Sequence, residues 1–297
     1  MAKSTVNNEM RRSRRQQLRK SACHVRPAPT CADLVGIVEE FLGMDYMLWP
    51  DGGYHSGSAD TPVRGVLITW MANVAALTEA VRQSCNIVVC HEAPLFAEKR
   101  EMPPYRWLTP NVGPLEPSRH PNSRRRRLIE KHGLTVFVCH YGLDRFGHEK
   151  AFADAVGLTR KYCDHGWESV YELARPTTVA ALADDIKRRL RIEGTIRVAG
   201  DLKKRVRRVG NFWGGLGLLS NVYWLRESIL HGAEVGICGE TDELMMHYAI
   251  DAGVPLIETS HQLSEEIGMR YYAGQVKHRF PDLRVVTFLQ GRPYRTL

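Results

Sequence analysis

Apolar positions along the chain alternate between short continuous runs and longer segments with helical spacing. Runs rich in Val and Ile, which are typical of buried strands, lie at residues 66–68, 87–90, 134–139 and 254–258. Between the first two runs, residues 74–83 place apolar side chains at helical spacing, and Asn73 can cap that helix. A strand, a helix and a second strand in this order predict parallel strands joined by a right-handed crossover.

The remainder of the chain continues this alternation. Thr30 and Asp33 resemble a capping box at the start of a helix that ends at Gly43. Further helices are predicted at residues 149–156, 179–191, 222–231, 242–252 and 264–279, and further strands at residues 168–173, 196–198, 206–209, 234–238 and 284–289. We expect the strands at 196–198 and 206–209 to be neighbours joined by a basic turn. The predicted class is α/β, with helices on both faces of mostly parallel or mixed sheets.

The chain of 297 residues is long enough for one large domain or two smaller ones. We expect two α/β lobes, at residues 30–165 and 166–297, after an N-terminal tail at residues 1–29. Residues 97–122 interrupt the first lobe with six prolines and no periodicity, which is typical of a functional or mobile loop. Its Tyr105 and Trp107 make this loop a candidate contact surface or lid, because aromatic residues are enriched at interfaces.

The net charge of +8 is concentrated at the N-terminus. Residues 1–26 hold eight Lys and Arg and one acid, Glu9, so this segment carries +7 and the rest of the chain +1. A polar and basic segment of this kind is typical of a disordered, solvated extension. Two alternatives stay open: an arm that binds nucleic acid or another polyanion, and an organelle-targeting peptide.

The sequence favours a cytoplasmic protein that does not associate with membranes. No stretch approaches the ~20 apolar residues of a membrane helix, and the N-terminus lacks the apolar segment of a secretory signal peptide. The seven cysteines are dispersed and form no CxxC pair, which favours reduced thiols.

Polar side chains with metal-binding chemistry follow three of the predicted strands. Each strand is followed by a histidine and a carboxylate: His91 with Glu92, His140 with Asp144, and His261 with Glu265. The carboxyl ends of strands are the ligand-binding edge of an open α/β sheet. A spacing of four residues, as in the second and third pairs, lets one helical turn aim both side chains at one point. Any single pair is more often structural, but three pairs after three buried strands indicate a shared site.

Imidazole nitrogens and carboxylate oxygens together suit Zn²⁺, Mn²⁺ or Fe²⁺, and the lack of thiolates argues against a closed structural zinc site. Three carboxylates and up to three histidines exceed what one ion needs. They suit two ions bridged by a carboxylate with an activated water between them. A competing interpretation makes Cys90 a thiol nucleophile with His140 as its base. Both Cys90 and Cys139 continue apolar runs, however, where a free cysteine packs as a small apolar side chain.

These motifs resemble those of the NIF-three-like dinuclear metal proteins, also known as type 2 GTP cyclohydrolase I homologues. Residues 90–96 resemble the family's "HHPL(I)F" motif, residues 140–144 its "HTNLD" motif, and residues 260–265 its "GHYxxE" motif. Residues 51–54 resemble its early "NVGL"-type loop. The likeness extends over roughly residues 30–290, with the four motifs in the family's order. Glu92 stands where a second histidine is usual, Ala93 is an additional residue before the proline, and Gln262 replaces the aromatic residue.

The resemblance implies a set of roles for these residues. The metal ligands would be His91, Glu92, Asp144, His261 and Glu265, with His140 as a nearby catalytic histidine or accessory ligand. It also implies two lobes around one cleft, two divalent ions and a toroidal hexamer with its sites facing an internal cavity.

We therefore expect a dinuclear metal-dependent hydrolase acting on a small molecule such as a nucleotide or phosphoester, similar to type 2 GTP cyclohydrolase. The first alternative is a non-enzymatic hexameric metal-binding scaffold or chaperone-like protein. The second alternative is nucleic-acid binding through residues 1–26.

Overall fold

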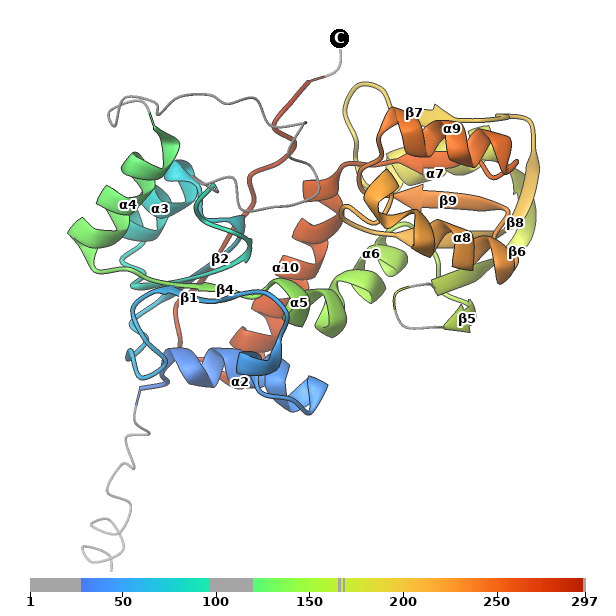
Figure 1. Cartoon of the computed structure of the whole chain (residues 1–297). Coiled ribbons are helices and arrows are strands. Elements are labelled where there is room, and N and C mark those ends of the chain that lie inside the picture. Colours follow the sequence, from blue (N-terminus) through green and yellow to red (C-terminus); the bar gives the residue numbers. More distant parts are fainter. Residues whose placement is uncertain (1–27, 97–119, 165–166, 168, 296–297) are drawn as a thin grey trace, which may run out of the picture.

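The computed structural model describes residues 28–96, 120–164, 167 and 169–295. Almost all of the predicted tail, and the proline-rich loop with Tyr105 and Trp107, lie outside these residues. The described strands form two mixed sheets flanked by helices, which confirms the predicted α/β class. In Figure 1 the two sheets lie in separate lobes, with α10 (His261–Arg279) between them.

The first sheet has the strand order β1-β4-β3-β2-β11. Its strands are β1 (Gly53–Ser56), β2 (Val66–Met71), β3 (Ile87–Glu92), β4 (Thr135–Val138) and β11 (Val285–Phe288). All are parallel except β1, which is antiparallel to β4 at the edge. The predicted strand–helix–strand unit is present as β2, α3 (Val74–Arg82) and β3, and Asn73 Oδ1 accepts a 2.9 Å hydrogen bond from Ala76 N.

Both faces of the first sheet are covered by helices. Residues of α2 (Cys31–Leu42) and α10 pack on the face that carries Ile68 and Val89. Residues of α3 and α4 (Pro121–His132) pack on the opposite face, against Leu67 and Val88. Burial on both faces explains why these strands are continuous apolar runs rather than alternating ones.

The second sheet has the strand order β5-β6-β8-β9-β10-β7. Its strands are β5 (Lys161–Asp164), β6 (Ser169–Thr178), β7 (Arg197–Ala199), β8 (Arg205–Phe212), β9 (Val235–Cys238) and β10 (Leu256–Glu258). The central strands β8, β9 and β10 are parallel. The helices around it are α6 (Glu149–Ala155), α7 (Val179–Arg189), α8 (Val222–Leu230) and α9 (Glu243–Asp251). Buried residues of α6 and α7 form one core of this lobe, and those of α8 and α9 form the other.

The prediction that residues 196–198 and 206–209 form neighbouring strands is wrong. β7 pairs antiparallel with β10 at the sheet edge, and β8 lies between β6 and β9. The long β6 offers β8 an antiparallel partner that extends over most of its length. β8 therefore pairs with β6 rather than with the three-residue β7, although strands close in sequence are usually neighbours.

The lobes also exchange segments across the expected boundary between residues 165 and 166. β5 precedes that boundary but pairs with β6 of the second sheet. At the other end of the chain, α10 leaves the second sheet and β11 returns to pair with β2 of the first. Apolar side chains of α10 such as Met269 and Tyr272 belong to the core of the first lobe. Their burial stabilises the packing of α10 against the first sheet.

The chain also forms short helical segments. They are η1 (Tyr46–Leu48), α5 (His140–Leu143), η2 (Asp144–His148) and η3 (Leu219–Asn221). None of the helices in the described ranges combines the length and apolar character that a membrane span requires.

Candidate metal centre

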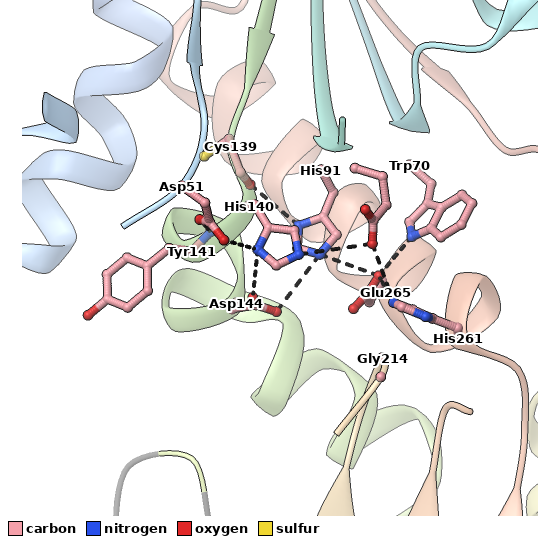
Figure 2. A network of polar contacts seen from close by, with 12 residues as sticks. Asp51, Trp70, His91, Cys139, His140, Tyr141, Asp144, Gly214, His261 and Glu265 are labelled. Atoms are coloured by element: carbon pink, nitrogen blue, oxygen red, sulfur yellow. Dashed lines mark hydrogen bonds and ion pairs between the residues drawn. The ribbon is translucent and has the colours of Figure 1, made fainter. Parts of the chain in front are cut away.

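Three chain segments converge where the carboxyl ends of strands from both sheets face each other. β3 ends in His91 and Glu92. The helix α5 begins at His140 shortly after β4, and α10 begins at His261 shortly after β10. The structure therefore brings together the three pairs that the strand ends predict, and Figure 2 shows most of them in one network. Their binding of metal stays a prediction.

Two irregular backbone features set the side chains in place. Ser260 has φ 140°, an unusual value for a residue other than glycine, and its Oγ accepts a hydrogen bond from Leu263 N. This sharp turn starts α10 directly at His261. The segment η2 is a single π turn, a feature that occurs frequently at functional sites. It carries Asp144 at its first residue and His148 at its last, and both side chains are buried.

Glu265 occupies the centre of the cluster. Its Oε2 lies 3.3 Å from His91 Nε2 and 3.1 Å from His261 Nε2. Glu92 Oε1 lies 3.5 Å from His261 Nε2 and 3.9 Å from His140 Nε2. One carboxylate oxygen of Glu265 thus reaches histidines from both lobes.

Asp144 joins the other side of the cluster. Its Oδ1 lies 3.9 Å from His91 Nε2, and its Oδ2 lies 3.7 Å from His140 Nδ1. The rings of His91 and His140 are stacked, with centroids 4.3 Å apart. In Figure 2 these two rings lie at the centre of the network, and Trp70 and His261 approach Glu265 from the other side.

Three sets of ligand-type atoms lie within 4.8 Å of one another. They are His91, Glu92 and His140; His91, Asp144 and His148; and Glu92, His261 and Glu265. The sets contain imidazole nitrogens and carboxylate oxygens but no thiol, as the sequence predicted. His91 Nε2 is fully buried and has no well-aligned hydrogen-bond partner in the described part of the chain. A buried donor or acceptor without a partner is costly, and a metal ion would satisfy it.

A second layer of side chains orients the carboxylates. Trp70 Nε1 donates a 2.7 Å hydrogen bond to Glu265 Oε2, and Trp213 Nε1 donates a 2.9 Å hydrogen bond to Asp144 Oδ1. Gly214 has φ 56°, and a Cβ at this position would come within 1.9 Å of Glu265 Oε1. This glycine therefore permits the close approach of the chain to Glu265.

The histidines are oriented in the same way. Glu240 Oε2 lies 2.9 Å from His261 Nδ1, and Asp51 Oδ2 lies 2.8 Å from His140 Nδ1. Such partners fix the orientation of an imidazole and leave its other nitrogen for the site. For His261 that nitrogen is Nε2, the atom closest to Glu265 and Glu92.

Burial and mutual attraction shift the titration of the cluster. Burial opposes protonation of His91, but the carboxylates of Glu265 and Asp144 outweigh it and raise its pKa to about 9. In His261, burial is likewise outweighed, by Glu265 and Glu240, and the pKa is raised to about 10. The same two histidines overcome the effect of burial on Glu265 and hold its pKa well below its usual value. Burial raises the pKa of Asp144 to about 6.

The cysteines at the strand ends are apolar packing residues. Cys90 and Cys139 are fully buried, and burial raises the pKa of the Cys90 thiol to about 12. A nucleophilic cysteine needs a lowered pKa and access to substrate. The structure therefore supports the packing interpretation.

Several residues of the site are absent from the sequence prediction. Glu240 follows the end of β9, so the strand-end argument that found the three pairs applies to it as well. His148 continues the four-residue spacing of His140 and Asp144, which is a signal that the sequence contains. The tryptophans Trp70 and Trp213 have no local pattern that points to their partners.

A cavity of about 560 Å³ opens beside the cluster, within the usual size range of small-molecule sites. His140, Asp144, His261 and Glu265 line one part of it, and aromatic side chains line another part. The aromatic part is formed by Trp167, Trp213, Trp224 and Tyr141. Trp167 and Trp213 are stacked with their centroids 5.8 Å apart. The cavity thus joins a flat apolar wall to a group of ionisable ligands.

The fold and the cluster define an α/β protein with two mixed sheets and a candidate His/Glu/Asp metal site between them. The model of the family Duf34/NIF3 (NGG1p interacting factor 3) matches residues 29–292. The chain is therefore a member of the Duf34/NIF3 family, as its motifs indicated.

Solved structures agree with this assignment and show that the relationship is distant. A Bacillus cereus protein related to NIF3 is 14% identical, with a TM-score of 0.74, over 91% of this chain and 100% of that one. The Staphylococcus aureus hypothetical protein SA1388 is 18% identical, with a TM-score of 0.71 and the same coverage. The protein ybgI, of unknown function, is 21% identical, with a TM-score of 0.68, over 89% of this chain and 100% of that one. No curated protein sequence matches the chain.

Proposed function

We propose that this protein is a dinuclear metal-dependent hydrolase that acts on nucleotide- or phosphoester-type small molecules. One observation carries the proposal: Glu265 lies within 3.3 Å of histidines from both lobes at the wall of a cavity. A carboxylate in this position can serve two neighbouring ions, and such pairs of ions are common in hydrolases that cleave phosphoesters.

The donor atoms fit two divalent ions. His91, Asp144 and Glu265 would hold one ion, and Glu92, His261 and Glu265 would hold the other. Nitrogen and oxygen donors without thiolates suit Zn²⁺, Mn²⁺ or Fe²⁺. When bound, these ions supply Lewis-acid polarisation of a substrate oxygen and a nucleophilic water at neutral pH.

His140 has the features of a general acid or base. About a third of its side chain is exposed, and it lines the cavity. Asp51 Oδ2 lies 2.8 Å from His140 Nδ1, which leaves His140 Nε2 to exchange a proton with a substrate or water. The hydrogen bond that His140 Nδ1 donates to Asp51 overcomes the effect of burial and raises the pKa of His140. The imidazole can therefore donate a proton to a leaving group near neutral pH.

The aromatic wall favours substrates that contain a planar ring. Trp167 and Trp224 line the same cavity as His140 and Glu265, and Trp167 stacks on the buried Trp213. Stacking on such faces would hold a nucleobase while the phosphate or ring carbon to be attacked faces the ionisable ligands. This arrangement supports a nucleotide over a small aliphatic phosphoester.

A substrate screen with defined metals tests the proposal. The protein, stripped of metal and reloaded with Zn²⁺, Mn²⁺ or Fe²⁺, is incubated with nucleotides and with phosphoesters that lack a base. We expect turnover of nucleotides that depends on metal and is lost in His140→Ala, while metal content stays the same. Metal binding without turnover of any substrate would instead support the alternative of a non-enzymatic scaffold.

A further inference from the structure

His148 is a buried histidine to which the proposed hydrolase function assigns no role. Its side chain is completely inaccessible, and it lies at the end of the π turn η2. Neither of its ring nitrogens has a hydrogen-bond partner among the residues that the structure describes. Buried polar groups in proteins are nearly always paired, so an imidazole with two unpaired nitrogens requires an explanation.

The ring of His148 lies beside the candidate metal ligands. Its centroid lies 4.4 Å from that of His91, with the two rings nearly perpendicular. A ring nitrogen of His148 lies within 4.8 Å of ligand-type atoms of both His91 and Asp144. All three of these side chains are buried, in contrast to Glu92 and His140, which are partly exposed.

The facing helix leaves room for this ring. Gly268 lies inside α10, and a Cβ at this position would come within 1.7 Å of His148 Nδ1. A glycine within a helix is unfavourable, so its presence indicates a packing requirement. A leucine at position 148 would fill the same space without unpaired nitrogens, so packing alone does not account for a histidine.

We propose that His148 is an additional metal ligand, which makes the two ion positions chemically different. One position would have two imidazoles, from His91 and His148, together with Asp144 and Glu265. The other would have the single imidazole of His261 together with the carboxylates of Glu92 and Glu265. This inference rests on the proposed metal centre, but it concerns which residues bind the first ion.

The difference between the positions has a consequence for metal selection. Imidazole suits Zn²⁺, whereas oxygen donors suit harder ions such as Mn²⁺. The buried position with two histidines takes up the first equivalent of Zn²⁺, and the position with Glu92 retains a preference for Mn²⁺ or Fe²⁺. Glu92 stands where the family motif has a second histidine. His148 would instead supply the additional imidazole at the neighbouring ion position.

Calorimetric titration of Zn²⁺ into the metal-free protein and into His148→Leu tests the assignment. We expect the first equivalent to bind the variant more than about 10-fold more weakly, since loss of even an outer partner of a ligand costs that much. The melting temperature of the metal-free variant stays the same or rises, because two unpaired buried nitrogens are removed. The increase in melting temperature on adding Zn²⁺ is reduced.

Ser228→Ala is the matched control. Ser228 is also fully buried, and its Oγ has no hydrogen-bond partner in the described residues, but it lies in α8, which carries none of the candidate ligands. This variant should bind Zn²⁺ as the unchanged protein does. Equal affinity of the first equivalent in His148→Leu and in the unchanged protein overturns the role of His148 and leaves the dinuclear centre standing.

A measurement on the unchanged protein removes any dependence on the folding of a variant. The X-ray absorption spectrum with one equivalent of Zn²⁺ counts the imidazoles around the ion. Two imidazoles support the assignment, whereas one imidazole contradicts it. Failure of the unchanged protein to bind any divalent ion overturns both this inference and the proposed function.

Discussion

Trp70 Nε1 donates a 2.7 Å hydrogen bond to Glu265 Oε2, the same oxygen that lies closest to His91 and His261. Trp70 belongs to β2 of the first sheet, and Glu265 belongs to α10, which begins directly after the second sheet. A partner of this kind fixes the orientation of a metal-binding carboxylate. Glu265 is therefore held at the junction of the lobes before any ion binds.

Replacement of Trp70 by Phe tests the importance of this hydrogen bond. The ring remains, but the donor is lost, so Glu265 is free to rotate. We expect metal affinity to fall about 10–100-fold, the usual effect of removing an outer-shell partner. Calorimetric titration measures this directly, with Trp224→Phe as a control because Trp224 lines the cavity but, in the part of the chain that the structure describes, donates no hydrogen bond to a candidate ligand carboxylate. Unchanged affinity in Trp70→Phe would show that packing alone orients Glu265.

Metal binding should release protons and strengthen as the pH rises. The carboxylates outweigh burial and raise the pKa of His91 to about 9 and that of His261 to about 10, so both imidazoles are protonated at neutral pH without metal. An ion must displace these protons to bind their nitrogens, and proton competition weakens with rising pH. The affinity should increase by up to about tenfold per pH unit for each displaced proton until those pKa values are passed.

Titration in buffers of different ionisation enthalpy counts the released protons. We expect a number above one near neutral pH that declines toward zero above about pH 10. A pH-independent affinity with no proton release would mean that neither His91 nor His261 binds the ion.

Ser260 is a site of backbone strain that a glycine should relieve. Its φ of 140° disfavours any residue with a Cβ, and the family motif has glycine at this position. Its hydroxyl offsets some of the strain through a weak 3.4 Å hydrogen bond from Leu263 N. Ser260→Gly should raise the free energy of unfolding by about 1 kcal/mol, since a glycine cap costs only a few tenths of that amount. Denaturant unfolding measures the change, and a lower stability would show that the serine cap outweighs the strain.

The sequence locates the three pairs of histidine and carboxylate because each pair follows a buried apolar run, and their binding of metal stays a prediction. Burial on both faces makes those runs recognisable, and the strand ends then locate His91, His140 and His261. The pairing of β7 with β10 and the return of β11 to β2 depend on contacts between distant segments, which leave no local pattern. For the same reason Trp70 is not recognisable as a partner of Glu265, since 195 residues separate them.

Assembly into a hexamer is a further proposal, based on the family resemblance. Large apolar side chains at Phe41, Met47 and Leu48 are 61%, 71% and 68% exposed, so they offer a contact surface near α2. Light scattering should give a mass of six copies of the 33.7-kDa chain. Met47→Glu should lower that mass because it places a charge on the contact surface. A mass of one chain at all concentrations would rule out the ring.

The most direct test of the metal centre is the metal content of protein purified without chelators. Elemental analysis should find up to two divalent ions per chain. The double variant His261→Ala with Glu265→Ala should lose most of this metal and keep its far-ultraviolet circular dichroism. The control replaces Glu243 and His247 by alanine, an exposed pair with the same spacing of four residues on α9. Equal metal content in the unchanged protein and in the His261/Glu265 variant would contradict the proposed centre.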